Sequence, residues 1–119
     1  MYFYLSSKDP SPYSNNSWSS FKIKLAEQIQ LSGLWWCALT EFHGYIPEGV
    51  SYIDINVDIC CESFLGGLKD FTTRRVFYKK GAERGAHWEF SNKYYIPVRL
   101  KNFDTIEIKL TSGGGCLSQ

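Results

Sequence analysis

An alternating acidic stretch is the first place where the residue types suggest chemistry. Asp54, Asn56 and Asp58 resemble the opening of a calcium-binding loop, which places oxygen ligands at alternate positions. Counting from Asp54, however, Ile59 falls where that loop requires glycine and Leu65 where it requires a bidentate glutamate. In an extended strand, Asp54 and Asp58 would lie roughly 13 Å apart at about 3.3 Å per residue, too far to share one ion without other ligands. The pattern therefore favours a solvated strand face.

The cysteines and histidines show no motif of a metal site or an active site. Cys60 and Cys61 are adjacent, and neighbouring side chains of a strand point to opposite faces, so they cannot act as a two-cysteine zinc clip. Cys37 or a serine could be combined on paper with His87 and Glu89 as nucleophile, base and orienting group. The nucleophile-elbow, zinc-protease and phosphate-loop motifs are all absent. We therefore expect no catalytic residues, no metal and no cofactor, and interpret the two histidines as packed or surface groups.

Positive charges gather in a short stretch of the second half of the chain, together with aromatic residues. They are Lys69, Arg74, Arg75, Lys79, Lys80 and Arg84, against only Asp70 and Glu83. Strand alternation places Arg75 and Lys79 on one face and Arg74 and Lys80 on the other, so only part of the set could follow a phosphate backbone. With a net charge of +1 for the whole chain, the pattern favours a solvated strand or an acidic protein partner over nucleic acid.

The elements that position these residues are predicted to be β-strands. Apolar residues alternate with polar ones in three runs, Tyr94–Leu100, Asp104–Leu110 and Ile53–Ile59. Further strands are expected at residues 2–5, 21–25, 72–78 and 88–90, with residues 81–85 as a hairpin tip. Residues 34–42 are apolar on both faces, which predicts a central strand covered on both sides. Pro97 cannot donate to a ladder, so its strand should lie at an edge or carry a bulge.

The composition fits a single small domain. The chain has 119 residues, of which 44% are hydrophobic and 17% aromatic, and no window shows a convincing helical period. About seven to nine short strands predict a small antiparallel β-sandwich of the jelly-roll kind over residues 1–111. Residues 6–20 are expected to form a long exposed loop and residues 112–119 a flexible tail.

The four cysteines are too few for a disulfide scaffold, so we expect reduced thiols. The N-terminal residues lack the charged and apolar regions of a secretory signal. No apolar run approaches the length of a membrane helix, about 18 residues. The sequence thus predicts a soluble protein without an export signal and without a membrane partner.

Several segments, read in order, resemble one family. They are Phe3-Tyr4-Leu5-Ser6-Ser7, Phe21-Lys22-Ile23-Lys24-Leu25, Ile29-Gln30-Leu31-Ser32-Gly33-Leu34-Trp35, Ala38-Leu39-Thr40-Glu41-Phe42, Tyr95-Ile96-Pro97-Val98 and Phe103-Asp104-Thr105-Ile106-Glu107-Ile108. This pattern is similar to virion-associated proteins of Polinton-like elements, adintoviruses and adomaviruses. It spans nearly the whole chain as a series of strand segments. Members often continue into a closing apolar strand, whereas this chain reads Gly113-Gly114-Gly115-Cys116, which leaves completion of the sheet by a partner strand open.

The resemblance implies a role in building or decorating a particle. We therefore expect a non-enzymatic viral structural protein, a minor capsid or cement component of the virion, made in the host cell. Its partners would be other capsid proteins or further copies of itself in an oligomer. The candidate contact residues are Tyr13, Trp18, Trp35, Trp88, Arg74, Arg75, Lys79 and Lys80, because large rings and arginines dominate interface hot spots.

Two other classes of function stay open at this point. A ligand-binding sandwich, for example for carbohydrate, would use exposed Trp or Tyr rings to stack on sugars. An enzyme would require His43, Cys60 or His87 to converge in a cleft.

Overall fold

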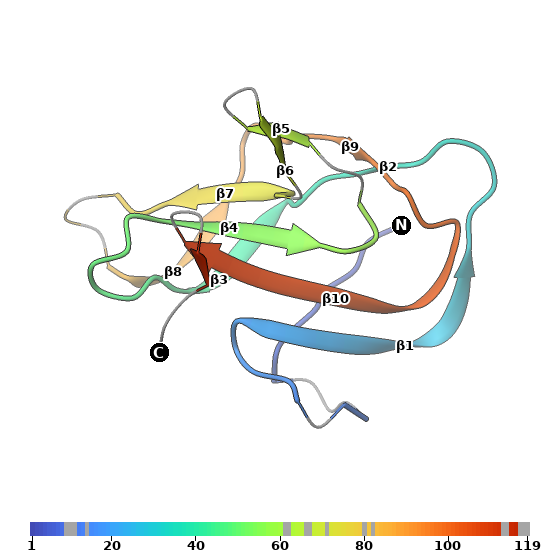
Figure 1. Ribbon diagram of the computed structural model, residues 1–119, viewed down its shortest axis with the longest axis horizontal. Helices are drawn as coiled ribbons and strands as arrows, with labels where there is room; N and C mark the ends of the chain where they lie inside the picture. Colours follow the sequence, from blue (N-terminus) through green and yellow to red (C-terminus); the bar gives the residue numbers. More distant parts are fainter. Residues whose placement is uncertain are drawn as a thin grey trace.

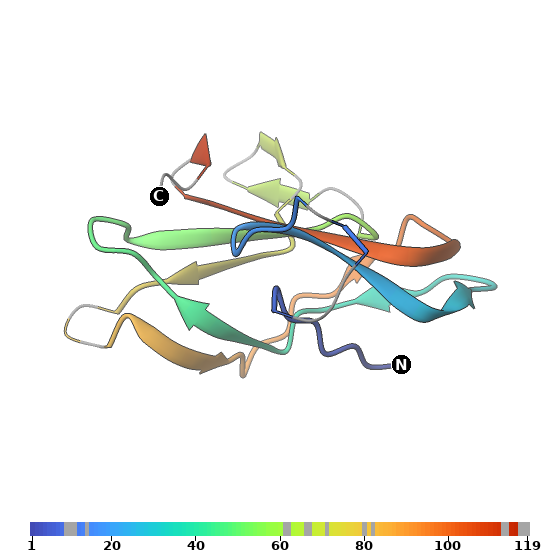
Figure 2. The ribbon, with the colours of Figure 1, turned by 90° about the horizontal axis from the view of Figure 1, so that it is seen from below.

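The period-two runs of the sequence form antiparallel strands that stack in two layers (Figures 1 and 2). The structure is a computed structural model and describes residues 1–8, 12–13, 15–60, 63–65, 68–70, 72–79, 81, 83–112 and 115–116. Within these residues it has eleven strands and no helix, and so none that is long and apolar enough to cross a membrane. The expected all-β class is confirmed.

The larger sheet forms one layer. Its strands follow the order β1 (Ser20–Gln30), β10 (Asn102–Ser112), β4 (Tyr52–Val57) and β7 (Arg74–Phe77), and β11 (Gly115–Cys116) pairs with the end of β10. In the register, Phe21 lies opposite Ile108, and Ile108 lies opposite Val57. Residues that lie opposite one another share a face of the sheet. The buried apolar side chains of these strands therefore share the face that meets the second layer, whereas Phe77 lies on the outer face.

The second layer is a broken ribbon made of two chain segments. β2 (Trp36–Cys37) pairs with β9 (Ile96–Pro97), and β3 (Glu41–Tyr45) pairs with β8 (Gly85–Glu89). Since residues 36–45 run antiparallel to residues 85–97 through both ladders, the two pairs continue one another. Figure 2 shows β3 and β8 beneath the layer that contains β1, β4 and β10. A separate small hairpin joins β5 (Ser63–Leu65) to β6 (Leu68–Asp70).

Two clusters of buried side chains fill the space between the layers. The first lies under β3 and β8 and contains Ile46, Ile53, Ile55, Val76 and Leu110, with Phe42, Trp88 and Phe90 among the residues packed against it. The second lies under β2 and β9 and contains Ile59, Cys60, Ile96, Phe103 and Ile106, with Phe3 and Leu5 among its neighbours. Both layers contribute to each cluster, which is the packing of a β-sandwich.

Several sequence predictions are confirmed in detail. Ile53, Ile55 and Ile59 are buried, as their alternation requires. Pro97 lies in β9, which among the described residues pairs with β2 alone, so its edge position is confirmed. The jelly-roll connectivity stays a prediction, as do the domain limits. Within the expected tail, Ser112 ends β10 and Gly115–Cys116 forms β11, and the remaining residues from 113 onward lie outside the described part.

A predicted hairpin and a predicted strand are wrong. Residues 81–85 do not form a hairpin tip, because β7 pairs with β4 whereas β8 pairs with β3, so the chain crosses from one layer to the other there. Residues 2–5 form no strand, although Phe3 and Leu5 pack on the second cluster. In both cases the local sequence pattern indicates an extended, partly buried chain, but it does not show which other strand, if any, that segment pairs with.

The prediction of a central strand at residues 34–42 is also wrong. This segment forms β2 and β3 of the outer ribbon, and Leu34 and Trp36 are 84% and 57% exposed. The inward side chains, such as Cys37 and Phe42, pack on the core. Apolar residues on both faces predict cover on both sides. Here only one face meets the other layer.

Two predictions about polar residues need correction. Asp54 does not lie on a solvated face, because it is 5% exposed and its carboxylate is paired with Arg75, which covers it. Cys37 and Cys60 are not reduced thiols but form a disulfide, with Cα atoms 6.8 Å apart. Val98 forms a bridge with Cys60, and Ile96, two residues earlier, pairs with Cys37. The segment from Ile96 to Val98 therefore brings both cysteines to the second cluster.

Candidate functional site

Large apolar side chains are exposed at the turn between β1 and β2. Gly33 turns the chain there with a φ of +82°, a conformation that glycine adopts readily. The lysine side chain of Lys101 donates to the carbonyl oxygen of Gly33, and the indole N–H of Trp35 donates to the carbonyl of Ser32 at 3.1 Å. The turn is thus held from both sides, and it presents Leu34 and the two tryptophans that follow it.

Trp36 and Tyr95 extend this surface across the β2–β9 ladder. Trp36 lies opposite Pro97, and both point away from the buried pair Cys37 and Ile96. Tyr95 directly precedes β9 and the buried Ile96, so its side chain is turned outward like that of Trp36. Tyr95 is 62% exposed. We call the surface formed by Leu34, Trp35, Trp36 and Tyr95 the apolar tip.

The other predicted aromatic contacts lie elsewhere. The hydroxyl of Tyr13 is 3.1 Å from Thr105 Oγ1, so this ring lies on the outer face of the larger sheet. Trp18 is exposed beside the start of β1. Trp88 packs on Phe42, with ring centroids 5.7 Å apart, and belongs to the surroundings of the first core cluster. Of the three tryptophans that the sequence predicted as contacts, Trp18, Trp35 and Trp88, only Trp35 belongs to the apolar tip.

The two predicted arginine contacts lie on opposite faces, as alternation requires. The guanidinium of Arg74 lies 4.1 Å and 4.2 Å from the ring centroids of Phe90 and Tyr94. Arg75 pairs with Asp54 on the opposite face. Lys79 is exposed, and Lys80 lies outside the described residues. Both arginines are therefore engaged within the fold, and they do not share one basic surface.

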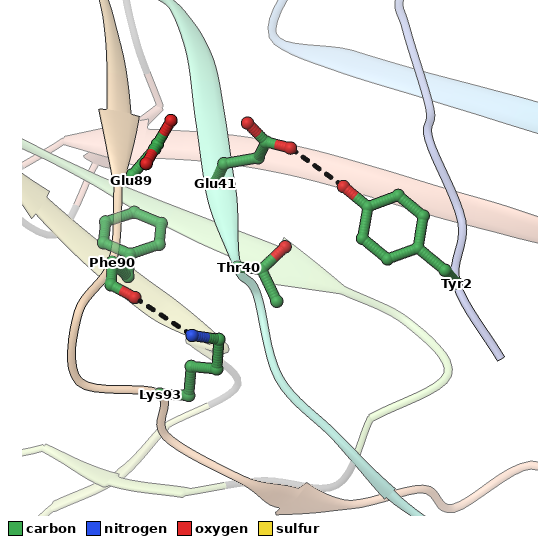
Figure 3. A pocket seen from close by; sticks show the side chains of 6 residues that line it. All are labelled: Tyr2, Thr40, Glu41, Glu89, Phe90 and Lys93. Carbon is green, nitrogen blue, oxygen red and sulfur yellow. Dashed lines mark hydrogen bonds between the residues drawn. The ribbon is translucent and has the colours of Figure 1, made fainter.

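A group of polar residues lies on the outer face of β3 and β8, away from the apolar tip. Glu41 lies directly opposite Glu89, and His43 lies directly opposite His87, with the two imidazole centroids 5.2 Å apart. His87 Nε2 is 2.5 Å from Glu41 Oε2, and the hydroxyl of Tyr2 donates to Glu41 Oε1 at 2.9 Å. The ligand atoms of Glu41, His87 and Glu89 lie within 4.8 Å of one another. Tyr2, Glu41 and Glu89 border an open depression of about 370 Å³ that is also lined by Lys93 (Figure 3).

The electrostatic setting of two acidic residues follows from their contacts. The hydrogen bonds from Tyr2 and with His87 lower the pKa of Glu41, because they stabilise its carboxylate. Burial raises the pKa of Asp58, although its carboxylate accepts the backbone N–H of Glu107 at 3.0 Å. The contacts of Glu41 therefore favour its ionised form, whereas the burial of Asp58 disfavours its charge.

The catalytic set that could be written with Cys37 as its nucleophile does not assemble. His87 and Glu89 share a face of β8, but Cys37 is bonded to Cys60 in the second core cluster, under β2 and β9. The convergence of His43 with His87 was missed by the sequence reasoning. The only available signal was the pair of alternating motifs, Glu41-x-His43 and His87-x-Glu89, because each places two ligand-type side chains on one strand face.

Comparison with models of protein families, with curated proteins and with solved structures finds no match for this chain.

Proposed function

We propose that this chain is a non-enzymatic structural protein of a viral particle, a minor capsid or cement component that acts through protein contacts. The viral assignment rests on the similarity of its strand segments to virion-associated proteins. The observation that best supports a contact role is the apolar tip. Its segment reads as a buried strand, yet Leu34 is 84% exposed and Trp36 57% exposed.

The size of these side chains makes the tip a plausible source of binding energy. Because Trp36 is 57% exposed, its burial in a contact would remove roughly 130 Å² of mostly apolar surface, worth about 3 kcal/mol at about 25 cal/mol per Å². Tyr95, exposed at the start of the paired strand β9, adds a second ring. Clustered rings of this kind are typical of interface hot spots.

The edge of β1 is protected against pairing with a strand of another chain. This favours the apolar tip, rather than strand addition, as the contact surface. The side chain of Asn16 accepts the backbone N–H of Lys22 and donates to its carbonyl oxygen, both at 2.9 Å. It thus occupies the place of a neighbouring strand. Lys22 and Lys24 are also exposed along this strand, and edge lysines disfavour pairing with another chain.

Sedimentation of the purified protein, alone and with its particles, tests the proposal. We expect concentration-dependent self-association or co-sedimentation, and a Trp36→Ala variant should weaken it by about 2 kcal/mol, roughly 30-fold in Kd. Phe77→Ala is the matched control, since Phe77 is a comparably exposed ring, 65%, on β7 of the other layer. A protein that stays monomeric and does not co-sediment would end the proposal.

A second candidate function is carbohydrate binding. Trp36 and Tyr95 are exposed on one face of the β2–β9 ladder, and such rings can stack on sugars. A glycan array distinguishes the two functions. Binding of a defined glycan that Trp36→Ala abolishes would favour the lectin-type module, whereas an empty array together with co-sedimentation would favour the particle role.

A further inference from the structure

We propose that Glu41, His87 and Glu89 form a zinc site on the outer face of the β3–β8 pair. The site lies on a different part of the ribbon from the apolar tip. The inference does not depend on the proposed structural role, and either can fail without the other.

The register of the two strands brings the three donors together. Glu41 lies directly opposite Glu89, and His87 is two residues from Glu89 on the same strand face. Their ligand atoms, one carboxylate oxygen from each glutamate and a ring nitrogen, lie within 4.8 Å of one another. Phe42 and Trp88, the residues between them, point the other way and pack together in the core. The donors therefore stand on a fixed backbone.

The distances require only side-chain adjustment. Tetrahedral zinc with bonds of about 2.0–2.1 Å places its donor atoms about 3.3 Å apart. The contact between His87 Nε2 and Glu41 Oε2, now 2.5 Å, would open by about 0.8 Å. The widest separation, at most 4.8 Å, would close by about 1.5 Å, shared between two side chains. Rotation about side-chain torsions supplies movements of this size.

The charges of the pair Glu41 and Glu89 also favour a cation. Like charges directly opposite one another on neighbouring strands destabilise the ladder. A divalent ion between the two carboxylates would replace that repulsion with two favourable contacts. Lys93, the cationic side chain that lines the same depression, donates instead to the carbonyl of Phe90 at 3.5 Å, at the other end of the depression in Figure 3.

The donor set selects zinc over calcium and magnesium. Zn²⁺ accepts both imidazole nitrogen and carboxylate oxygen as ligands, whereas Ca²⁺ and Mg²⁺ are bound by oxygen ligands. His87 and Glu89 are exposed, so water can reach the fourth position. A site with three protein ligands and one water follows from this geometry.

A neighbouring residue orients one of the donors. Tyr2 donates to Glu41 Oε1 (Figure 3) and so leaves Oε2 free for the contact with His87. The ring of His43 lies beside that of His87, with the centroids 5.2 Å apart, but His43 is not one of the three donors. Partners that orient metal ligands in this way contribute to affinity without touching the ion.

Calorimetric titration of the purified protein with ZnCl₂ tests the site. We expect one Zn²⁺ per chain, removed by a chelator, and a rise in the unfolding temperature when zinc is present. His87→Ala and Glu89→Gln should each weaken binding at least roughly 100-fold, and Tyr2→Phe roughly 10-fold. His87→Gln serves as the second variant if His87→Ala does not fold.

Matched controls separate this site from general attraction of a cation. Glu27→Gln makes the same change of charge as Glu89→Gln on an exposed residue of β1 in the other layer, and it should leave zinc binding unchanged. His43→Phe keeps a ring beside His87 and should also bind zinc as before. Absence of zinc binding, equal losses in Glu27→Gln and Glu89→Gln, loss of binding in His43→Phe, or equal affinity for Mg²⁺ would each overturn the three-donor site.

Discussion

Replacing Arg75 by methionine tests how the outer face of the larger sheet is covered at Asp54. Arg75 donates from Nε to Oδ1 at 2.6 Å and from Nη2 to Oδ2 at 2.9 Å. The side chains of Arg75 and Asp54 are 26% and 7% exposed. Removal of one partner from a buried pair costs about 3–5 kcal/mol, because the other charge stays buried and unpaired. Water can reach the partly exposed position of Arg75, so we expect the lower end, about 3 kcal/mol.

Thermal and urea unfolding measure this loss. For a chain of this size, about 3 kcal/mol lowers the unfolding temperature by about 12 °C. Lys24→Met is the matched control, since it removes the same charge from an exposed ion pair. The side chains of Lys24 and its partner Asp104 are 49% and 38% exposed. Exposed pairs contribute less than about 1 kcal/mol.

A double variant separates loss of the ion pair from loss of packing. Asp54→Leu combined with Arg75→Met removes both charges and should recover most of the stability, because an apolar pair of similar volume can replace a buried ion pair. The reasoning fails if Arg75→Met costs no more than Lys24→Met. That result would mean that Asp54 is solvated, as its sequence pattern suggested.

Three further outcomes are expected. The pKa of Glu41 is lowered chiefly by the hydrogen bond from Tyr2, so this group stabilises the fold above its ordinary pKa and loses that effect as the pH falls through the lowered value. Tyr2→Phe should therefore raise the pKa of Glu41 in an NMR titration. Reduction of the disulfide between Cys37 and Cys60, which spans a sequence separation of 23, should lower the free energy of unfolding by roughly 3 kcal/mol in urea titrations with and without reductant. Ile106→Ala should cost about 2–5 kcal/mol in the same assay, because Ile106 is 1% exposed in the second cluster.

The strands could be predicted from the sequence because alternation is a local property. Ile53 and Ile55 are buried as their spacing requires. The partner of a strand is a non-local property, which explains why residues 81–85 were expected to form a hairpin and instead cross between layers. The exposure of Leu34 and Trp36 could not be predicted from the sequence for a related reason. Hydrophobicity predicts burial, but an exposed apolar side chain cannot be told from a buried one by its residue type.

The polar site could be predicted only in part. Glu41-x-His43 and His87-x-Glu89 show that each strand carries two ligand-type residues on one face. They do not show that the two strands pair, nor that Glu41 lies opposite Glu89. Glu41 and His87 are 46 positions apart in the sequence, and their approach depends on the whole sandwich.

The register of β3 against β8 links the core to the outer surface. A slip of one residue in either strand would turn its side chains to the opposite face. Phe42 and Trp88 would then face solvent, and Glu41 and His87 would face the apolar cluster around Ile53. Burial of the two rings therefore fixes where the donors stand, even though the rings touch none of them. The same ribbon continues through β2 and β9 to the apolar tip, so the packing that holds its inner face also determines which side chains both parts of its outer face expose.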